Sequence, residues 1–179
     1  MKNRGLAIVS LLLALGGLGT GIYSIISMNQ YINEKNAYTL PMARVYYSGV
    51  SYSIPSGVSY VNLDYNSKTF DTHEAFNLLL NVYIIPETGF YHIIAQYSIG
   101  AESDDFFQIL LFKNGNLISE KAYTSSRDTN AFGVSLSDMH NFTQGDSLTI
   151  KAYQYNMGSL PRTIFDGEEF TFFTIMKVS

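Results

Sequence analysis

The chain has 179 residues and a formal net charge of −4; aromatic residues make up 15%, through 14 Tyr and 12 Phe without Trp, and charged residues only 15%. This length allows one domain with a sizeable core plus an appendage, and the composition is typical of β structure. The absence of cysteine excludes disulfides, thiolate metal sites and cysteine nucleophiles. Residues 42–179 contain eight Lys and Arg and fourteen Asp and Glu. They contain no stripe of basic residues, which excludes nucleic-acid binding.

The first element in chain order is an uncharged stretch from Gly5 to Met28. At about 1.5 Å per residue it exceeds the roughly 30 Å thickness of a bilayer core, so it predicts one transmembrane helix retained as a signal-anchor. The alternative is a cleaved signal peptide, but that has an apolar region of only about 7 to 15 residues and a small-residue cleavage site, for which "YSIISMNQY" is poor. Because Lys2 and Arg4 precede the span, we expect a cytoplasmic amino terminus at the cell membrane and an extracellular carboxy-terminal domain.

A stripe of small residues runs along this predicted helix at steps of four and three, which places its members on one face: Ser10, Ala14, Gly17, Gly21 and Ser24. Such a stripe allows close helix packing in lipid. Other small residues lie off the stripe, so a chance arrangement stays open. Residues 29–41 are polar and end in Pro41, which predicts a stalk between residues 1–28 and a head formed by residues 42–179.

The sequence of the head alternates short runs rich in Val, Ile, Tyr, Phe and Thr with turn sequences, and this pattern predicts two packed β-sheets. Asn114-Gly115 predicts a type I′ hairpin between strands at 105–113 and 116–124. A second pair is expected between 131–142 and 147–156, around Gly145-Asp146. The stretch "IIPETGFYHIIAQYSIG" at 84–100 predicts strand, turn and strand, and 168–179 predicts a last strand with aromatic residues on both faces.

The order of these signals resembles the globular head domain of complement C1q, which is similar in fold to tumour necrosis factor. The resemblance rests on six pieces in family order: Ala43 and Arg44, Phe70 and Asp71, Pro86 with Gly89 and Tyr91, Lys113-Asn114-Gly115, Gly145-Asp146, and Phe170 to Phe173. It implies an all-β head, a jelly-roll β-sandwich of the ten-stranded type, here preceded by one transmembrane α-helix. The family's collagen-like tract and cysteine are absent from this chain.

Two sets of residues are candidates for sites. Glu102, Asp104 and Asp105 supply hard oxygen ligands in one loop, as Ca²⁺ requires, and the resemblance implies calcium binding near this loop in some relatives; the alternative is a solvated acidic loop. Asn141-Phe142-Thr143 matches the N-glycosylation acceptor pattern beside a turn. We expect no required cofactor, with calcium as the one candidate.

Catalytic chemistry has little support in the sequence. His73, His92 and His140 lack ligand spacing, and "FDTHEAFN" is interpreted as structural, with Phe70 and Phe76 as core anchors. Nucleophile-elbow, zinc-protease, P-loop and dinucleotide motifs are all missing. We therefore predict that the protein is not an enzyme.

The functional expectation is a single-pass cell-surface module that binds or adheres to an extracellular protein or glycan through its head loops. The resemblance implies a homotrimer, and large rings on both faces of the predicted strands favour burial of outer faces in an assembly. The alternative is a structural subunit of an extracellular filament or coat, in which residues 29–41 add a strand to a neighbouring copy.

Overall fold

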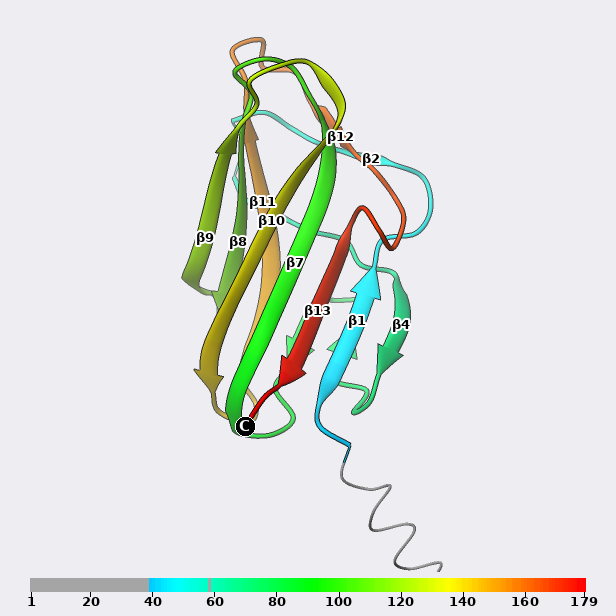
Figure 1. Ribbon diagram of the computed structural model, residues 1–179, viewed down its shortest axis with the longest axis vertical. Coiled ribbons are helices and arrows are strands. Elements are labelled where there is room, and N and C mark those ends of the chain that lie inside the picture. The colour runs from blue at the N-terminus through cyan, green and yellow to red at the C-terminus, as the bar shows by residue number, and fades with distance from the viewer. Residues whose placement is uncertain (1–38, 58) are drawn as a thin grey trace, which may run out of the picture. The chain divides into compact units, whose positions relative to one another are not determined.

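The head is a sandwich of two antiparallel sheets in the computed structural model, which describes residues 39–57 and 59–179 (Figure 1). Seven strands form one sheet, in the order β2 (Tyr52–Ile54), β12 (Arg162–Ile164), β7 (Gly89–Ala101), β13 (Phe172–Lys177), β1 (Met42–Tyr46) and β4 (Ser67–Asp71), with β10 (Thr129–Phe142) also paired to β7. The other sheet has the order β5 (Phe76–Asn77), β6 (Val82–Ile84), β11 (Ser147–Tyr155), β8 (Phe106–Lys113) and β9 (Asn116–Thr124), with β3 (Val61–Asn62) also paired to β11. The predicted all-β jelly-roll sandwich is confirmed.

The core lies between the sheets because the strands alternate inward and outward side chains. In β7 the inward residues are Tyr91, Ile93, Ala95, Tyr97 and Ile99, all fully buried, and in β11 they are Leu148, Ile150, Ala152 and Gln154. The buried cluster draws its members from positions 43 to 175 and lies entirely within the compact unit Leu40–Ser179. The head therefore has a hydrophobic core of its own.

The predicted hairpin between β8 and β9 is confirmed. Asn114 and Gly115 both have positive φ, 50° and 79°, as a type I′ turn requires. The Asn114 side chain reaches the turn between β10 and β11, where its amide donates to Asp146 Oδ1 at 2.7 Å and accepts from the Ser147 N–H at 2.8 Å. Lys113 Nζ adds an ion pair to Asp146 at 2.7 Å, so two turns are held as one unit.

The strand, turn and strand predicted at 84–100 are present, but the two strands do not pair, and the pair predicted between 131–142 and 147–156 is wrong, because both turns cross from one sheet to the other. β6 belongs to the six-stranded sheet and β7 to the seven-stranded one, and β10 and β11 are separated in the same way. The two crossing turns bind each other, since Gly145 N–H donates to Ile85 O and Ile85 N–H to Asp146 O, both at 2.8 Å. Turn residues encode a reversal of the chain, whereas strand partners are chosen by packing between distant segments.

Phe76 is buried in the core as predicted, but Phe70 is exposed. The reason is that β4 is the edge strand next to β1, where Phe70 lies opposite Arg44 on the outer side of the sheet.

Both ends of the described head meet at the end of the sandwich that carries the crossing turns (Figure 1). Lys177 N–H donates to Pro41 O at 2.8 Å, and Phe90 N–H donates to Ser179 O at 2.9 Å. Gly89 has φ +156°, and a Cβ there would lie 2.2 Å from the Ser179 carbonyl oxygen. The loops at 102–105, 125–128 and 156–161 lie at the opposite end, which we call the loop end (Figure 1).

The predicted span at 5–28, its stripe from Ser10 to Ser24 and most of the predicted stalk lie outside the described residues. Within residues 39–57 and 59–179 there is no helix with the length and apolarity that a membrane crossing requires.

Candidate functional site

Arg162, the first residue of β12, ties the loop end together. Its Nε lies 2.6 Å from Asp105 Oδ2 and its Nη2 3.1 Å from Asp105 Oδ1, which is a bidentate pair. The same guanidinium reaches Glu102, with Nη2 2.9 Å from Oε2 and Nη1 3.1 Å from Oε1. The hydrogen bonds that Arg162 donates to Asp105, and next those to Glu102, raise its pKa against the opposing effect of burial, so the side chain stays cationic.

A buried amide network shapes the adjoining loop at 156–161. Gln154 is fully buried, and its Nε2 donates to the carbonyls of Ile54 and Leu160, both at 3.0 Å. Asn156 Nδ2 donates to Leu160 O at 2.7 Å and to Gln154 Oε1 at 3.0 Å. The sequence held one signal of this network, which is a glutamine at an inward position of a strand whose other inward residues are apolar.

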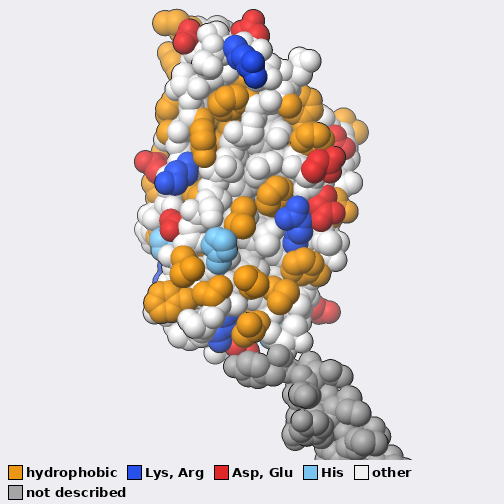
Figure 2. Space-filling model, viewed as in Figure 1, with side chains coloured by type: hydrophobic (Ala, Val, Ile, Leu, Met, Phe, Trp, Pro, Cys, Tyr) orange, Lys and Arg blue, Asp and Glu red, His pale blue; other side chains and the backbone are white. Residues whose placement is uncertain are grey.

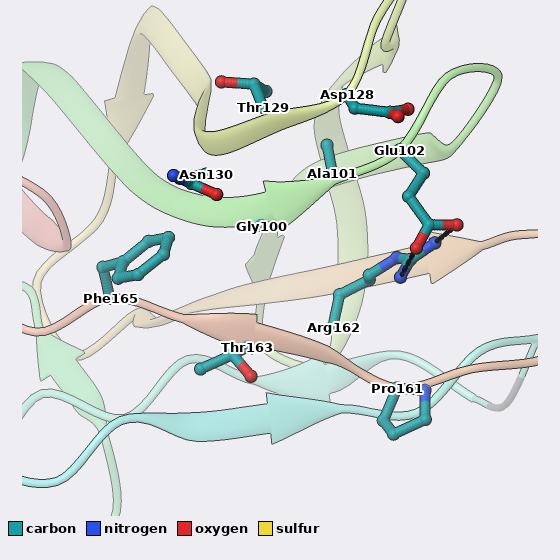
Figure 3. A pocket seen from close by; sticks show the side chains of 10 residues that line it. All are labelled: Gly100, Ala101, Glu102, Asp128, Thr129, Asn130, Pro161, Arg162, Thr163 and Phe165. Atoms are coloured by element: carbon teal, nitrogen blue, oxygen red, sulfur yellow. Dashed lines mark hydrogen bonds and ion pairs between the residues drawn. The ribbon is translucent and has the colours of Figure 1, made fainter.

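A cleft of about 590 Å³ opens beside Arg162 (Figure 3). Its lining residues come from the end of β7, the start of β10, β12 and the loop residues next to these strands: Gly100, Ala101, Glu102, Asp128, Thr129, Asn130, Pro161, Arg162, Thr163 and Phe165. Figure 3 shows the Glu102–Arg162 pair on one side of the cleft and Phe165 with Asn130 on the other. Mixed charged, amide and hydroxyl groups with one aromatic ring can bind a polar ligand.

Two of the three predicted calcium ligands already have a cationic partner. Glu102 and Asp105 are both paired with Arg162, whereas Asp104 is exposed, with φ +68°, and donates its backbone N–H to Ser125 O. The described part of the chain contains no group of three His, Cys, Asp or Glu residues arranged to hold a metal ion. The calcium site stays a prediction, and Ca²⁺ would have to compete with Arg162 for two of its three ligands.

The three histidines have separate partners. His73 lies 3.9 Å from a Glu87 oxygen, His92 Nε2 is 3.0 Å from Ser137 Oγ, and His140 Nε2 is 3.1 Å from Asp138 Oδ2. Asp138 also accepts a hydrogen bond from Ser119. Because the Ser119 hydroxyl donates to Asp138 and not to His140, these three residues lack the nucleophile–base contact that covalent catalysis needs.

The outer face of the seven-stranded sheet carries an unusual number of exposed apolar side chains (Figure 2). Strand register places four of them close together, on β7, β10 and β13, with exposed fractions of 36 to 55%: Phe90, Ile94, Met139 and Met176. We call these four residues the apolar strip. Antiparallel sheets of monomers usually present polar side chains on the outer face, so the strip has the character of a contact surface.

Two polar features border the apolar strip. The Arg44 guanidinium stacks on the Phe172 ring at 4.2 Å and pairs with Glu168 at 2.9 Å, so its charge is already compensated. Asn141, the predicted glycosylation site, is exposed on the same outer face, two residues from Met139 along β10.

Solved structures with the same fold come from the tumour necrosis factor and complement groups. Eiger TNF from S. frugiperda superposes with a TM-score of 0.61 at 11% identity, over 78% of this chain and 93% of that chain. For murine APRIL at pH 5.0 the values are 0.58, 10%, 78% and 100%, and for the globular domain of zebrafish complement 1qA protein 0.58, 14%, 79% and 98%. No protein-family model matches the chain, and no curated protein matches it. At these identities the comparison shows the fold, and it confirms the C1q/TNF-like jelly roll.

Proposed function

We propose that this chain, whose head has the jelly-roll fold seen in tumour necrosis factors and in a C1q globular domain, is a membrane-anchored extracellular homotrimer that binds a ligand. The observation that carries the proposal is the apolar strip. Its Phe, Ile and Met side chains surround His92, which lies opposite Met139 on β10 and Met176 on β13. Contact of these apolar side chains with water costs free energy, and burial against a second surface removes that cost.

The occupant that we propose for the strip is the same chain. The resemblance of the sequence to C1q heads implies packing around a three-fold axis, and the strip supplies an apolar interface of the kind found in obligate oligomers. Arg44 fits such an interface because Glu168 and the Phe172 ring already satisfy its guanidinium.

Ligand binding is assigned to the loop end, which lies opposite Pro41 in the head (Figure 1). The Arg162 ion pairs and the Gln154–Asn156 amide network hold the loops in one shape, which lowers the entropy lost on binding. The cleft beside them presents polar groups without a nucleophile–base pair, so the proposed activity is recognition and not catalysis.

The oligomer is tested by the mass of the purified head, residues 42–179, in solution at micromolar concentration. We expect three copies, and we expect Ile94→Lys to yield folded monomers because it places a charge in the strip. Leu117→Lys is the matched control, since Leu117 is 43% exposed but lies on β9 of the other sheet. A monomeric parent head would contradict a trimer built by the head, and long fibres would favour the filament alternative. A trimer that needs residues 1–41 would assign assembly to the stripe from Ser10 to Ser24.

The membrane orientation is tested by protease treatment of intact cells. We expect loss of the head without lysis, because the basic residues before the predicted span favour a cytoplasmic amino terminus. A head that is digested only after lysis would contradict an extracellular role.

Calcium binding is tested by thermal unfolding of the head with and without millimolar Ca²⁺. A ligand that binds only the folded state raises the melting temperature, and Asp104→Asn should then abolish the rise. This variant leaves the Arg162 pairs intact, so loss of the shift reports the metal ligand and not the loop. An unchanged parent melting curve would leave the solvated acidic loop as the explanation.

Glycosylation of Asn141 and trimer formation are expected to compete. A glycan on the outer face next to Met139 would obstruct a copy that packs on the apolar strip. Asn141→Gln should therefore raise the trimer fraction of any glycosylated protein. An unchanged trimer fraction would mean that a glycan at Asn141 does not reach the trimer contact.

A further inference from the structure

A second pocket lies on the outer face of the six-stranded sheet, the side of the sandwich opposite to the apolar strip. Its volume is about 480 Å³, and five uncharged residues line it: Ser59, Tyr60, Phe106, Gln108 and Tyr153. We propose that this pocket binds a neutral saccharide ring. The proposal rests on the proposed function only in that it needs the head to face the outside of the cell.

Strand register creates the floor of the pocket. Tyr153 of β11 lies directly opposite Gln108 of β8, and Phe106 lies one outward position further along β8. Their neighbours Phe107 and Ala152 point into the core. The three pocket residues are therefore fixed by two long central strands and not by a loop.

Tyr60 forms the wall. Its ring packs against Tyr153, with centroids 5.9 Å apart and planes at 70°, and against Phe112 at 6.0 Å. Phe106 contacts the other side of Tyr153 at 6.4 Å and 71°. Three rings thus meet at steep angles around one polar side chain, Gln108.

The wall is anchored by a small apolar layer outside the main core. Leu110 is fully buried and Phe112 nearly so, although both point outward from β8. The Lys151 side chain covers this layer, with Nζ 4.4 Å from the Phe112 ring centroid. Because Tyr60 packs on the layer, the pocket is already formed without a ligand.

The polar groups of the pocket have no internal partners. Among the residues that the structure describes, none donates to or accepts from the Gln108 side-chain amide, the Tyr60 and Tyr153 hydroxyls or the Ser59 hydroxyl. The amide both donates and accepts, as do the three hydroxyls. A ligand bound here must therefore offer hydrogen-bonding groups of both kinds at its edge, or these groups lose water without compensation.

These features select the ligand class. A sugar ring has an apolar C–H face to lie on aromatic rings and a rim of hydroxyls that donate and accept. A cationic ligand is disfavoured because no carboxylate lines the pocket and the ammonium of Lys151 is near it. A purely apolar ligand would leave the amide and three hydroxyls unpaired.

The location of the pocket has a consequence for affinity. In a trimer whose contacts leave the outer face of the six-stranded sheet exposed, three such pockets are present. Simultaneous engagement of a repeating glycan then raises apparent affinity above that of one pocket.

The test uses the full chain in detergent and two probes. Methyl glycosides of glucose, galactose, mannose, fucose and N-acetylglucosamine are screened by saturation-transfer NMR, and a microarray of neutral glycans reports multivalent binding. We expect at least one glycoside to bind at millimolar concentration. Tyr153→Ala and Gln108→Leu should each weaken binding at least tenfold, whereas Tyr155→Ala, an exposed tyrosine on the same strand that does not line the pocket, should bind like the parent.

The outcomes separate this site from the trimer. Binding by a chain that proves monomeric would sustain the pocket and overturn the oligomer. A trimer that binds none of the probes, or that binds them equally well after both pocket substitutions, would overturn the saccharide site.

Discussion

Replacing Arg162 with methionine should destabilise the head by about 3 kcal/mol, because the Asp105 carboxylate loses its partner. The side chains of Asp105 and Arg162 are 3% and 11% exposed, so solvent screens the pair little. Removing one member of a buried ion pair costs about 3–5 kcal/mol. The low end applies here because the Glu102 N–H, 2.9 Å from Asp105 Oδ2, still donates to the carboxylate. The Glu102 side chain is 60% exposed, so its own pair with Arg162 adds less than about 1 kcal/mol.

The assay is urea and thermal unfolding at a fixed protein concentration, since assembly also stabilises the head. At about 4 °C per kcal/mol for a domain of this size, the melting temperature should fall by about 12 °C. Asp105→Asn should cost less, about 1–2 kcal/mol, because Arg162 keeps Glu102, and the double variant should be more stable than the sum of the two losses predicts. A variant within 1 kcal/mol of the parent at pH 7 would refute the reasoning.

Three further predictions concern stability. Gly89→Ala should destabilise the head by about 1–3 kcal/mol, because its Cβ would strike the C-terminal backbone, while Gly133→Ala, with open space around it, should be neutral in the same denaturation assay. Burial raises the pKa of Asp146, but its hydrogen bonds and ion pair outweigh this and hold the pKa below its ordinary value. Its stabilising contribution is therefore complete above the unfolded-state pKa of about 3.9 and lost as the pH falls through the lower folded value, so Asp146→Asn should flatten the acid limb of a stability–pH curve. Tyr65→Phe should leave stability unchanged or raise it, because the buried hydroxyl has no hydrogen-bond partner among the described residues, whereas Tyr97→Phe should lose about 1 kcal/mol with its bond to a backbone carbonyl. Urea midpoints that fall equally for both tyrosine variants would contradict this contrast.

Local chemistry explains which parts of the fold were predictable. The β8–β9 hairpin follows from Asn114-Gly115, because few other residue pairs adopt positive φ twice in succession. Pro86–Gly89 and Gly145-Asp146 equally mark chain reversals, yet both connect different sheets. Whether such a turn forms a hairpin or connects the two sheets depends on which distant strands pair with β7. Core packing decides that pairing, and the turn residues do not.

At the loop end, too, contacts between residues close in sequence were predictable and those between distant residues were not. The acidic residues Glu102 and Asp105 are close in sequence, so their grouping was visible, but their partner Arg162 follows Asp105 by 57 positions. A single sequence contains nothing that links the two. Without the arginine the cluster favours a cation site, and with it two of the three carboxylates are already compensated.

The short first strand has a mechanical consequence. β1 is hydrogen-bonded on both sides, to β13 and to β4, and its first residue follows Pro41. If the chain is anchored through its amino terminus and holds a ligand at the loop end, tension runs along β1. A pull in that direction loads the hydrogen bonds of both ladders together in shear, whereas a pull across the sheet would break them one after another. Under such a load the architecture therefore favours slow forced unfolding of the head.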